Sequence, residues 1–347
     1  MTRLHLAANQ GQIGGGEVML LRTARAARDA GLDVTVVAPD DPDETLASAR
    51  AAGFDVVAVP GEGRAAYARG LRRWDRDRRG VLWCHGLLPA LATAGRPGRL
   101  VHLHQLPTGA AQWLSLTVAR RRALAVLVPS AFLAHRVPGS RVLANWTDAP
   151  ARPRDVPTPG RSPVLGFLGR HSQDKGLDVL ADAIALLGTR LGADLRLLAA
   201  GDDRFVPETQ RQAVATALAR LAGRVDLPGW MERTAFFDAV DLVVVPSVFA
   251  ESFGLAVAEA MAARVPFVVT DTGALPEVAG PGHPWVAPAG DAAALAAVLA
   301  DALRADPAAD LVRACARWER EYSPAAGGLR VASLLAELGL TVTEPAS

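Results

Sequence analysis

The sequence predicts an α/β protein built from two doubly wound domains that face each other across a cleft. Its 347 residues exceed what one compact α/β domain usually holds, so two domains are expected. In both halves short apolar runs alternate with longer amphipathic runs, which is the pattern of strands and helices around a parallel sheet. A proline-rich stretch at residues 151–163 predicts a linker between the halves, the alternative being an ordinary long surface loop.

The expected elements follow this alternation. The first helix is expected over residues 18–30, where Ala, Leu and Arg are frequent, and we expect domains at residues 1–150 and 164–322, followed by a C-terminal segment at 323–347. Apolar runs predict strands at 4–8, 34–38, 56–59, 81–84, 100–104, 125–128, 142–143, 164–168, 195–200, 225–227, 242–245 and 267–270. Amphipathic runs predict further helices at 176–187, within 208–221, from 253–254 onward, and at 292–303, 311–320 and 328–338.

Composition excludes several classes of protein. Lys and Arg number 37 against 36 Asp and Glu, so no overall positive charge predicts a nucleic-acid partner. The two cysteines, Cys84 and Cys315, define neither a disulfide framework nor a four-ligand zinc site. No apolar run has the length of a signal peptide or a membrane span, so we expect a cytoplasmic enzyme. Contact with a membrane face and the oligomeric state stay open.

The strongest chemical signal is a pair of glutamates, Glu251 and Glu259, with seven residues between them. The segment follows an apolar strand and begins a helix, so its backbone N–H groups can bind a phosphate. Glu259 would lie inside the helix and accept hydrogen bonds from ribose hydroxyls, whereas Glu251 would face the transferred sugar. The alternative is an amphipathic helix with two solvated glutamates. The turn expected to bind the ligand consists of Ser252, Phe253, Gly254 and Leu255.

A second signal follows the strand expected at 164–168. Gly169 and Arg170 end that strand, and Lys175 stands just before the next helix. Arginine offers a planar fork for phosphate oxygens, and lysine supplies a compact charge. Together the two cations can neutralise a diphosphate and stabilise it as a leaving group.

These blocks resemble the motifs of retaining glycosyltransferases with the GT-B fold, in particular those of glycosyltransferase family four. The resemblance implies that Glu251 contacts the donor sugar and Glu259 the nucleotide ribose. It also implies that Arg170 and Lys175 hold the donor pyrophosphate. Leu227, in the turn Leu227-Pro228-Gly229-Trp230, matches the family's contact with the nucleotide base.

The same resemblance implies a domain arrangement. Two Rossmann-like domains face each other across a cleft, with the acceptor on residues 1–150 and the nucleotide sugar on residues 164–322. The segment 323–347 is expected to pack back on the N-terminal domain. Two positions depart from the family's pattern: Arg264 stands where many relatives have glycine, and Ser323 lacks the tryptophan that often follows such a serine.

A glycine cluster follows the first expected strand. Gly15 and Gly16 belong to the loop that leads into the first helix, where backbone can approach a ligand closely, and in the family this loop reaches the sugar and phosphate. The spacing is not that of dinucleotide-binding proteins, yet Asp40 ends the second strand, where a ribose-binding acid would lie. A dinucleotide-binding protein without catalysis therefore stays an alternative.

Histidines supply the last candidates. His104 ends the strand expected at 100–104, His102 precedes it on the same face, and His85 follows the strand expected at 81–84. The family has a histidine at the position of His104, near the reacting sugar, so the resemblance gives His104 a catalytic role and His85 a secondary one. A hydrogen-bonded structural histidine is the alternative for each.

No metal site is expected. Asp41–Asp43 and Asp75–Asp77 resemble the D-x-D metal motif, but both lie in stretches typical of solvated surface. The basic stretch Arg69–Arg79 is expected to be a solvated helix face, with contact to an acidic acceptor or a membrane surface as the alternative.

The predicted function is retaining, metal-independent transfer of a sugar from a nucleoside-diphosphate sugar to a hydroxyl. No prosthetic group is expected, because the donor is a substrate. A sugar-nucleotide epimerase is an alternative, whereas phosphorolysis is disfavoured because no lysine is placed to anchor pyridoxal phosphate. The acceptor is a natural product or a cell-envelope glycan, and the sequence does not distinguish the two.

Overall fold

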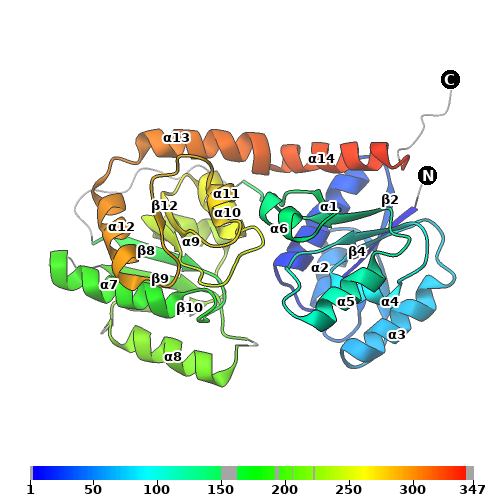
Figure 1. Ribbon diagram of the computed structural model, residues 1–347, viewed down its shortest axis with the longest axis horizontal. Helices are drawn as coiled ribbons and strands as arrows, with labels where there is room; N and C mark the ends of the chain where they lie inside the picture. Colours follow the sequence, from blue (N-terminus) through cyan, green and yellow to red (C-terminus); the bar gives the residue numbers. More distant parts are fainter. Residues whose placement is uncertain (1–2, 150–161, 192–194, 205, 222, 341–347) are drawn as a thin grey trace. The chain divides into compact units, whose positions relative to one another are not determined.

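The computed structural model describes residues 3–149, 162–191, 195–204, 206–221 and 223–340. The chain forms two compact units (Figure 1). Unit 1 comprises Met1–Asn145 and Ala325–Ser347, and unit 2 comprises Trp146–Pro324. The division after Asn145 precedes the expected linker at 151–163, nearly all of which lies outside the described residues.

Unit 1 contains a parallel sheet with the strand order β3-β2-β1-β4-β5-β6-β7 in the described residues. Its strands read as continuous Val, Leu and Ala runs because helices cover both faces of such a sheet. The strands are β1 (Arg3–Ala7), β2 (Asp33–Pro39), β3 (Asp55–Val59), β4 (Val81–His85), β5 (Arg99–His102), β6 (Ala125–Val128) and β7 (Arg141–Val142).

The helices of unit 1 come from both ends of its sequence. The C-terminal helix is drawn in red in Figure 1, and it is joined to the body of the unit by Arg330 Nη2, which donates to Ala144 O at 3.2 Å. An ion pair between Arg141 and Glu337 adds a second link. The helices are α1 (Gly15–Asp29), α2 (Glu44–Ala51), α3 (Gly63–Asp75), α4 (Leu87–Ala92), α5 (Ala110–Ala119), α6 (Ala131–Arg136) and α14 (Pro324–Glu337).

Unit 2 repeats the architecture with the parallel strand order β10-β9-β8-β11-β12-β13. Its first helix buries Leu177, Leu180, Ile184 and Leu187, whose spacing of three or four residues places them on one face. The strands are β8 (Val164–Leu168), β9 (Arg196–Ala200), β10 (Val225–Gly229), β11 (Leu242–Val245), β12 (Phe267–Thr270) and β13 (Val286–Ala287). The helices are α7 (Leu177–Leu191), α8 (Glu208–Ala219), α9 (Arg233–Ala239), α10 (Leu255–Ala263), α11 (Leu275–Ala279), α12 (Ala292–Arg304), α13 (Ala308–Arg317) and a π-helical turn, η1 (Trp318–Tyr322).

Both units therefore confirm the predicted doubly wound α/β class. In each sheet the strand order reverses next to the first strand, between β1 and β4 and between β8 and β11. Ligands of such sheets bind outside the carboxyl ends of the strands at this reversal. Within the described ranges, no helix combines the length and apolar character needed to cross a bilayer.

Several predicted boundaries were wrong, among them three at the ends of elements. The strand expected at 100–104 ends at His102, the helix expected at 311–320 gives way to η1 after Arg317, and the helix expected at 328–338 already begins at Pro324. Tertiary contacts shape the π-helical turn, since Trp318 Nε1 donates to Thr147 Oγ1 at 2.9 Å. Proline suits the first turn of a helix because its missing N–H has no intrahelical partner there.

Candidate functional site

In unit 2 two loops meet at the reversal of the strand order. One follows β8 and carries Arg170 and Lys175, and the other follows β11. They are joined by the backbone N–H groups of Val248 and Phe249, each of which donates to Asp174 O at 3.0 Å. A side chain at Gly176, which has a φ of 69°, would collide with the carbonyl of Pro246. The contact between the loops therefore requires glycine, and it places both cations beside the loop that contains Glu251.

Glu251 lies at the centre of this site. Lys175 Nζ donates to Glu251 Oε1, and Ser247 Oγ donates to the same oxygen at 2.7 Å. Burial opposes ionisation of Glu251, but Lys175, the hydroxyl of Ser247 and the charge of Arg170 hold the pKa of this carboxyl below its usual value. Glu251 is therefore a carboxylate at neutral pH, and the ammonium of Lys175 is held in place at the end of β8.

The helix that follows Glu251 is preceded by a glycine at its N-cap position. Gly254 has a φ of 95° and precedes α10, and a Cβ atom there would lie 2.5 Å from Leu275 Cδ2. Gly273 has a φ of 62°, and a side chain there would collide with the backbone of Glu251. The bare backbone at these two positions lets the first turn of α10 lie next to Glu251. Its N–H groups are available to an anion, as at any helix N-terminus.

The remaining predicted nucleotide contacts surround this turn. Glu259 lies on α10, and its Oε2 is 3.3 Å from Arg233 Nε, so the structure gives this carboxylate a protein partner. Phe253 is buried and packs edge-on against Tyr322, with ring centroids 5.3 Å apart. Leu227 is exposed on β10. Gly169, Ser252 and Leu255 are partly exposed.

In unit 1 three histidines meet where β4 and β5 end. His85 and His102 are paired in the register of these strands, and His104 lies two residues beyond. His85 Nδ1 is 3.0 Å from His104 Nε2, and the ring centroids of His102 and His104 are 4.3 Å apart. His85 and His102 are fully buried, whereas His104 is partly exposed. We refer to these three residues as the histidine cluster.

Burial sets the protonation of the histidine cluster. Desolvation lowers the pKa of His104 to about 4. It lowers the pKa of His85 and of His102 well below the usual value, and the neighbouring rings of the cluster add to this effect. All three rings are therefore neutral at neutral pH.

The glycine segment of unit 1 lies against the same cluster. Helix α1 begins at Gly15, and a Cβ atom at Gly16 would lie 3.4 Å from Cδ2 of His104. The next residue, Glu17, is buried, and desolvation raises the pKa of its carboxyl to about 7. Asp40 accepts a hydrogen bond from the backbone N–H of Gly61 at 3.3 Å.

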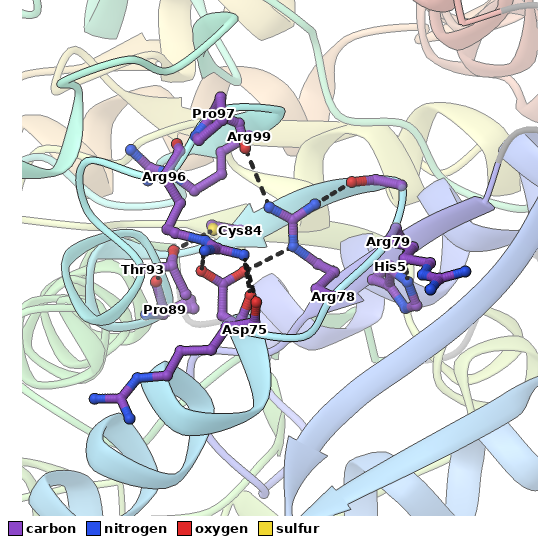
Figure 2. Close-up of polar contacts among 12 residues, drawn as sticks. His5, Asp75, Arg78, Arg79, Cys84, Pro89, Thr93, Arg96, Pro97 and Arg99 are labelled. Atoms are coloured by element: carbon purple, nitrogen blue, oxygen red, sulfur yellow. Dashed lines mark hydrogen bonds and ion pairs between the residues drawn. The ribbon is translucent and has the colours of Figure 1, made fainter.

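The expectation of solvated surface was wrong for Asp75 and Arg78. Arg78 Nε donates to Asp75 Oδ1 at 2.7 Å (Figure 2), and both side chains are almost wholly buried. Arg96 Nη2 adds a bond to Asp75 O at 2.7 Å. These contacts fix the end of α3, so Asp75 is structural and not half of a metal motif. Arg78 also lines a cavity of about 520 Å³ at the amino ends of β1, β2 and β3, opposite the histidine cluster.

Two residues of the sites were not predicted. Ser247 was missed because a serine after an apolar strand carries no signal of its own. Glu17 was missed because an acidic residue in the first turn of a helix usually caps it in solvent. Their burial and contacts are properties of the folded chain.

Comparison with known proteins identifies the class. The family of glycosyl transferases group 1 matches residues 162–305. The phosphatidyl-myo-inositol mannosyltransferase of Mycobacterium leprae is 30% identical over 332 residues, which is 84% of each chain. A D-inositol 3-phosphate glycosyltransferase of Nocardia farcinica is 35% identical over 179 residues, 48% of this chain and 36% of that one.

Solved structures agree on the fold. The structure of Anabaena Alr3699/HepE in complex with UDP and glucose superposes with a TM-score of 0.82 at 19% identity, covering 97% of this chain and all of that one. The two doubly wound sheets and these neighbours define a glycosyltransferase of the GT-B fold. The chain belongs to the group 1 glycosyltransferases, of the family-four type, which confirms the predicted family and enzyme class.

Proposed function

We propose that this enzyme transfers a sugar, with retention of anomeric configuration and without a catalytic metal ion, from a nucleoside-diphosphate sugar bound to unit 2. The observation that carries the proposal is the arrangement of Arg170, Lys175 and the first turn of α10 around Glu251. Cations and helix N–H groups suit a pyrophosphate, and they act most strongly on the charge that develops as it departs. Solved neighbours are described as complexes with UDP and with UDP-glucose, which supports a donor of this class.

Each predicted donor residue takes a role in this proposal. Lys175 and Arg170 bind the diphosphate, together with the backbone of Gly169, Ser252 and Gly254. Glu251 positions Lys175 and accepts hydrogen bonds from hydroxyls of the transferred sugar. The ribose binds at Glu259, where Arg233 is its present partner, and the base lies against the backbone of Leu227. Phe253 and Leu255 fix the turn.

The first unit contributes to the sugar and the acceptor. We assign contacts with the transferred sugar to His104, Gly15 and Gly16. His104 is neutral at neutral pH because it is desolvated, so it can donate or accept a hydrogen bond without adding charge.

The contacts of the carboxylate beside Lys175 support the proposal of retention. The only carboxylate next to Lys175 in the described contacts is Glu251, whose Oε1 is already bonded to Lys175 and Ser247. We therefore propose that the acceptor hydroxyl attacks from the face that the diphosphate leaves. The C–O bond to the diphosphate breaks, the new glycosidic bond forms, and the acceptor's proton passes to a departing phosphate oxygen. No bond to the protein is required.

For the acceptor we propose a hydroxyl of a cell-envelope glycan or glycolipid. The support is that relatives carry the names phosphatidyl-myo-inositol mannosyltransferase and D-inositol 3-phosphate glycosyltransferase. A natural-product acceptor is the competing outcome of the transfer assay.

Donor binding can be measured at a single amine. Lys175 is the only lysine in the chain, so reductive ¹³C-methylation labels one side chain in addition to the α-amino group. Titration with UDP and GDP, and then with their sugars, is expected to shift the methyl signal of Lys175 while the α-amino signal stays unchanged. An unshifted Lys175 signal under saturating nucleotide would contradict the assignment of the diphosphate site.

The reaction is then tested with the donor that binds best. NMR of the product formed on inositol-containing acceptors is expected to show the donor's anomeric configuration, and inversion would overturn the proposed mechanism. Arg170→Ala is expected to lower turnover, whereas Arg304→Ala, which removes an exposed arginine of α12, is not. Incubation of the donor without acceptor tests the epimerase alternative, which requires a changed sugar on intact nucleotide.

A further inference from the structure

The histidine cluster has more hydrogen-bonding atoms than partners. Its one internal bond joins His85 and His104. Four ring nitrogens are buried without a partner in the described residues: both of His102, Nε2 of His85 and Nδ1 of His104. A buried polar atom without a partner costs roughly 1–3 kcal/mol, so native proteins usually satisfy such atoms with an ion, a ligand or water.

The rings are close enough to share one ion. One nitrogen from each of the three rings lies within 4.8 Å of the others. A tetrahedral ion with bonds of about 2.0–2.1 Å to imidazole needs its ligand atoms roughly 3.3 Å apart. Two of the ligands lie at paired positions of adjacent strands, so the protein backbone holds them at a fixed spacing. Binding of the ion requires the three rings to turn toward one common point.

We propose that His85, His102 and His104 bind one divalent transition-metal ion, with Zn²⁺ as the representative. Imidazole ligands suit Zn²⁺, Co²⁺, Ni²⁺ and Cu²⁺, whereas Mg²⁺ and Ca²⁺ prefer oxygen. Three histidines leave the fourth position of a tetrahedral ion open for water or an anion. A metal ligand must be a neutral imidazole, so metal binding is expected to weaken at acid pH.

The surroundings define the open position. His104 is the ring of the cluster that is partly exposed, so the fourth ligand enters on its side. Gly16 packs against this ring without a side chain. Glu17, which is buried, follows Gly16, and its carboxylate would partly offset the charge of the ion.

The ion would oppose transfer and not promote it. This consequence rests on the proposed function, in which His104 contacts the transferred sugar. The leaving diphosphate is negatively charged, and the positive charge that stabilises it is supplied in unit 2 by Arg170 and Lys175. The ion therefore has no part in that step. Because His104 is a ligand, metal binding and sugar contact compete for the same ring.

Binding is tested on the full, tag-free chain after treatment with a chelator. Titration with Co²⁺ is expected to give the visible absorption bands of a four-coordinate site and to saturate at one ion per chain. Crystals soaked with Co²⁺ or Zn²⁺ are expected to show an anomalous-scattering peak between the three rings. Failure to bind stoichiometrically, or a peak located elsewhere, overturns the metal site.

Variants then locate the site in solution. His102→Gln is expected to weaken binding by at least about 100-fold, because losing a ligand costs more than losing an outer partner. His135→Gln, which changes an exposed histidine of α6, is the matched control and is expected to bind normally. If His102→Gln does not fold, the Co²⁺ titration of the wild-type chain and the anomalous peak still show whether the histidine cluster binds a metal ion.

The transfer assay separates this proposal from the proposed function. Zn²⁺ is expected to inhibit wild-type turnover, and a chelator is expected to restore it. Binding without inhibition would overturn the competition at His104 and leave the metal site standing. Absence of binding with normal transfer would overturn the metal site and leave the transferase function standing.

Discussion

The two units share the order of their first six strands but place opposite kinds of polar group where their strands end. In unit 2 the groups are charged and paired, with Lys175 bonded to Glu251. In unit 1 they are neutral rings, packed so closely that His102 has no hydrogen-bond partner in the described residues. The same backbone architecture therefore supports two chemistries, one suited to an anion and one suited to hydroxyls or a metal ion.

This difference has a simple physical origin. The unit 2 site stays partly exposed, so the ion pair of Lys175 and Glu251 retains part of its hydration and both groups stay ionised. The unit 1 site is enclosed by β4, β5 and the glycine segment, and desolvation there favours the uncharged form of each group. Four predictions test the contrast, from the largest expected effect to the smallest.

Removal of the charge in unit 2 should abolish most activity. Lys175→Ala is expected to lower kcat by about 100- to 1,000-fold, because a preorganised donor to the developing anion is lost. The measurement is steady-state turnover together with unfolding in urea. Lys175→Ala also leaves the Glu251 carboxylate without its cation, so the double variant with Glu251→Gln should regain stability but not turnover. Recovery of turnover in the double variant would contradict the role of the ammonium.

A side chain at Gly273 should distort the unit 2 site. Gly273→Ala places a Cβ atom against the backbone of Glu251 at a left-handed φ of 62°. We expect a loss of about 3 kcal/mol in the free energy of unfolding. Gly282→Ala is a matched control, since its φ is 78° and a Cβ atom there has no neighbour within 4 Å. It should cost only about 1 kcal/mol, and equal losses in the two variants would show that the contact with Glu251 is unimportant.

The neutral character of unit 1 should appear as a pH dependence. The pKa of Glu17 is raised to about 7 in the folded chain. The native state therefore holds a proton that the unfolded state releases from about pH 4.5 upward, and this carboxyl lowers stability as pH rises to about 7. Glu17→Gln removes the penalty, so its stability relative to wild type should be greater at pH 8 than at pH 5 by about 2 kcal/mol.

The quantity to measure is the difference in the free energy of unfolding between Glu17→Gln and wild type at each pH. The lowered pKa of His104 has the opposite sign, since it removes stability as pH falls from about 6.5 toward 4. The two effects oppose each other in wild-type protein, but the His104 effect is common to both proteins and cancels from the comparison, which leaves the Glu17 effect. Urea unfolding at both pH values gives the result, and a pH-independent difference would show that the Glu17 carboxyl is well solvated.

Each unit has one non-glycine residue with a left-handed backbone among the described residues, Arg122 in unit 1 and Arg264 in unit 2. Arg264 ends α10 with a φ of 55°, which is a conformation that glycine adopts without strain. Arg264→Gly and Arg122→Gly are each expected to raise the free energy of unfolding by about 1 kcal/mol. Thermal denaturation measures the change, and destabilisation of either variant would show that the arginine side chain matters more than its backbone.

The sequence by itself determined the fold class and most of the elements, and it supplied the candidate residues of the donor site. Continuous apolar runs specify buried parallel strands, and the glutamate pair with Arg170 and Lys175 lies in local segments whose spacing is visible in the chain. Arg264 also differs from the glycine that many relatives have at this position, which is consistent with its left-handed backbone. Local patterns of this kind need no knowledge of distant contacts.

Only the tertiary structure decided which side chains meet and which are desolvated. The contact of Lys175 with Glu251 spans 76 positions, and the histidine cluster forms because β4 and β5 are neighbours in the sheet. The burial of Asp75 likewise depends on Arg78 and Arg96 closing over it. Protonation and metal affinity depend on burial, and burial is set by the whole fold rather than by any segment of the sequence.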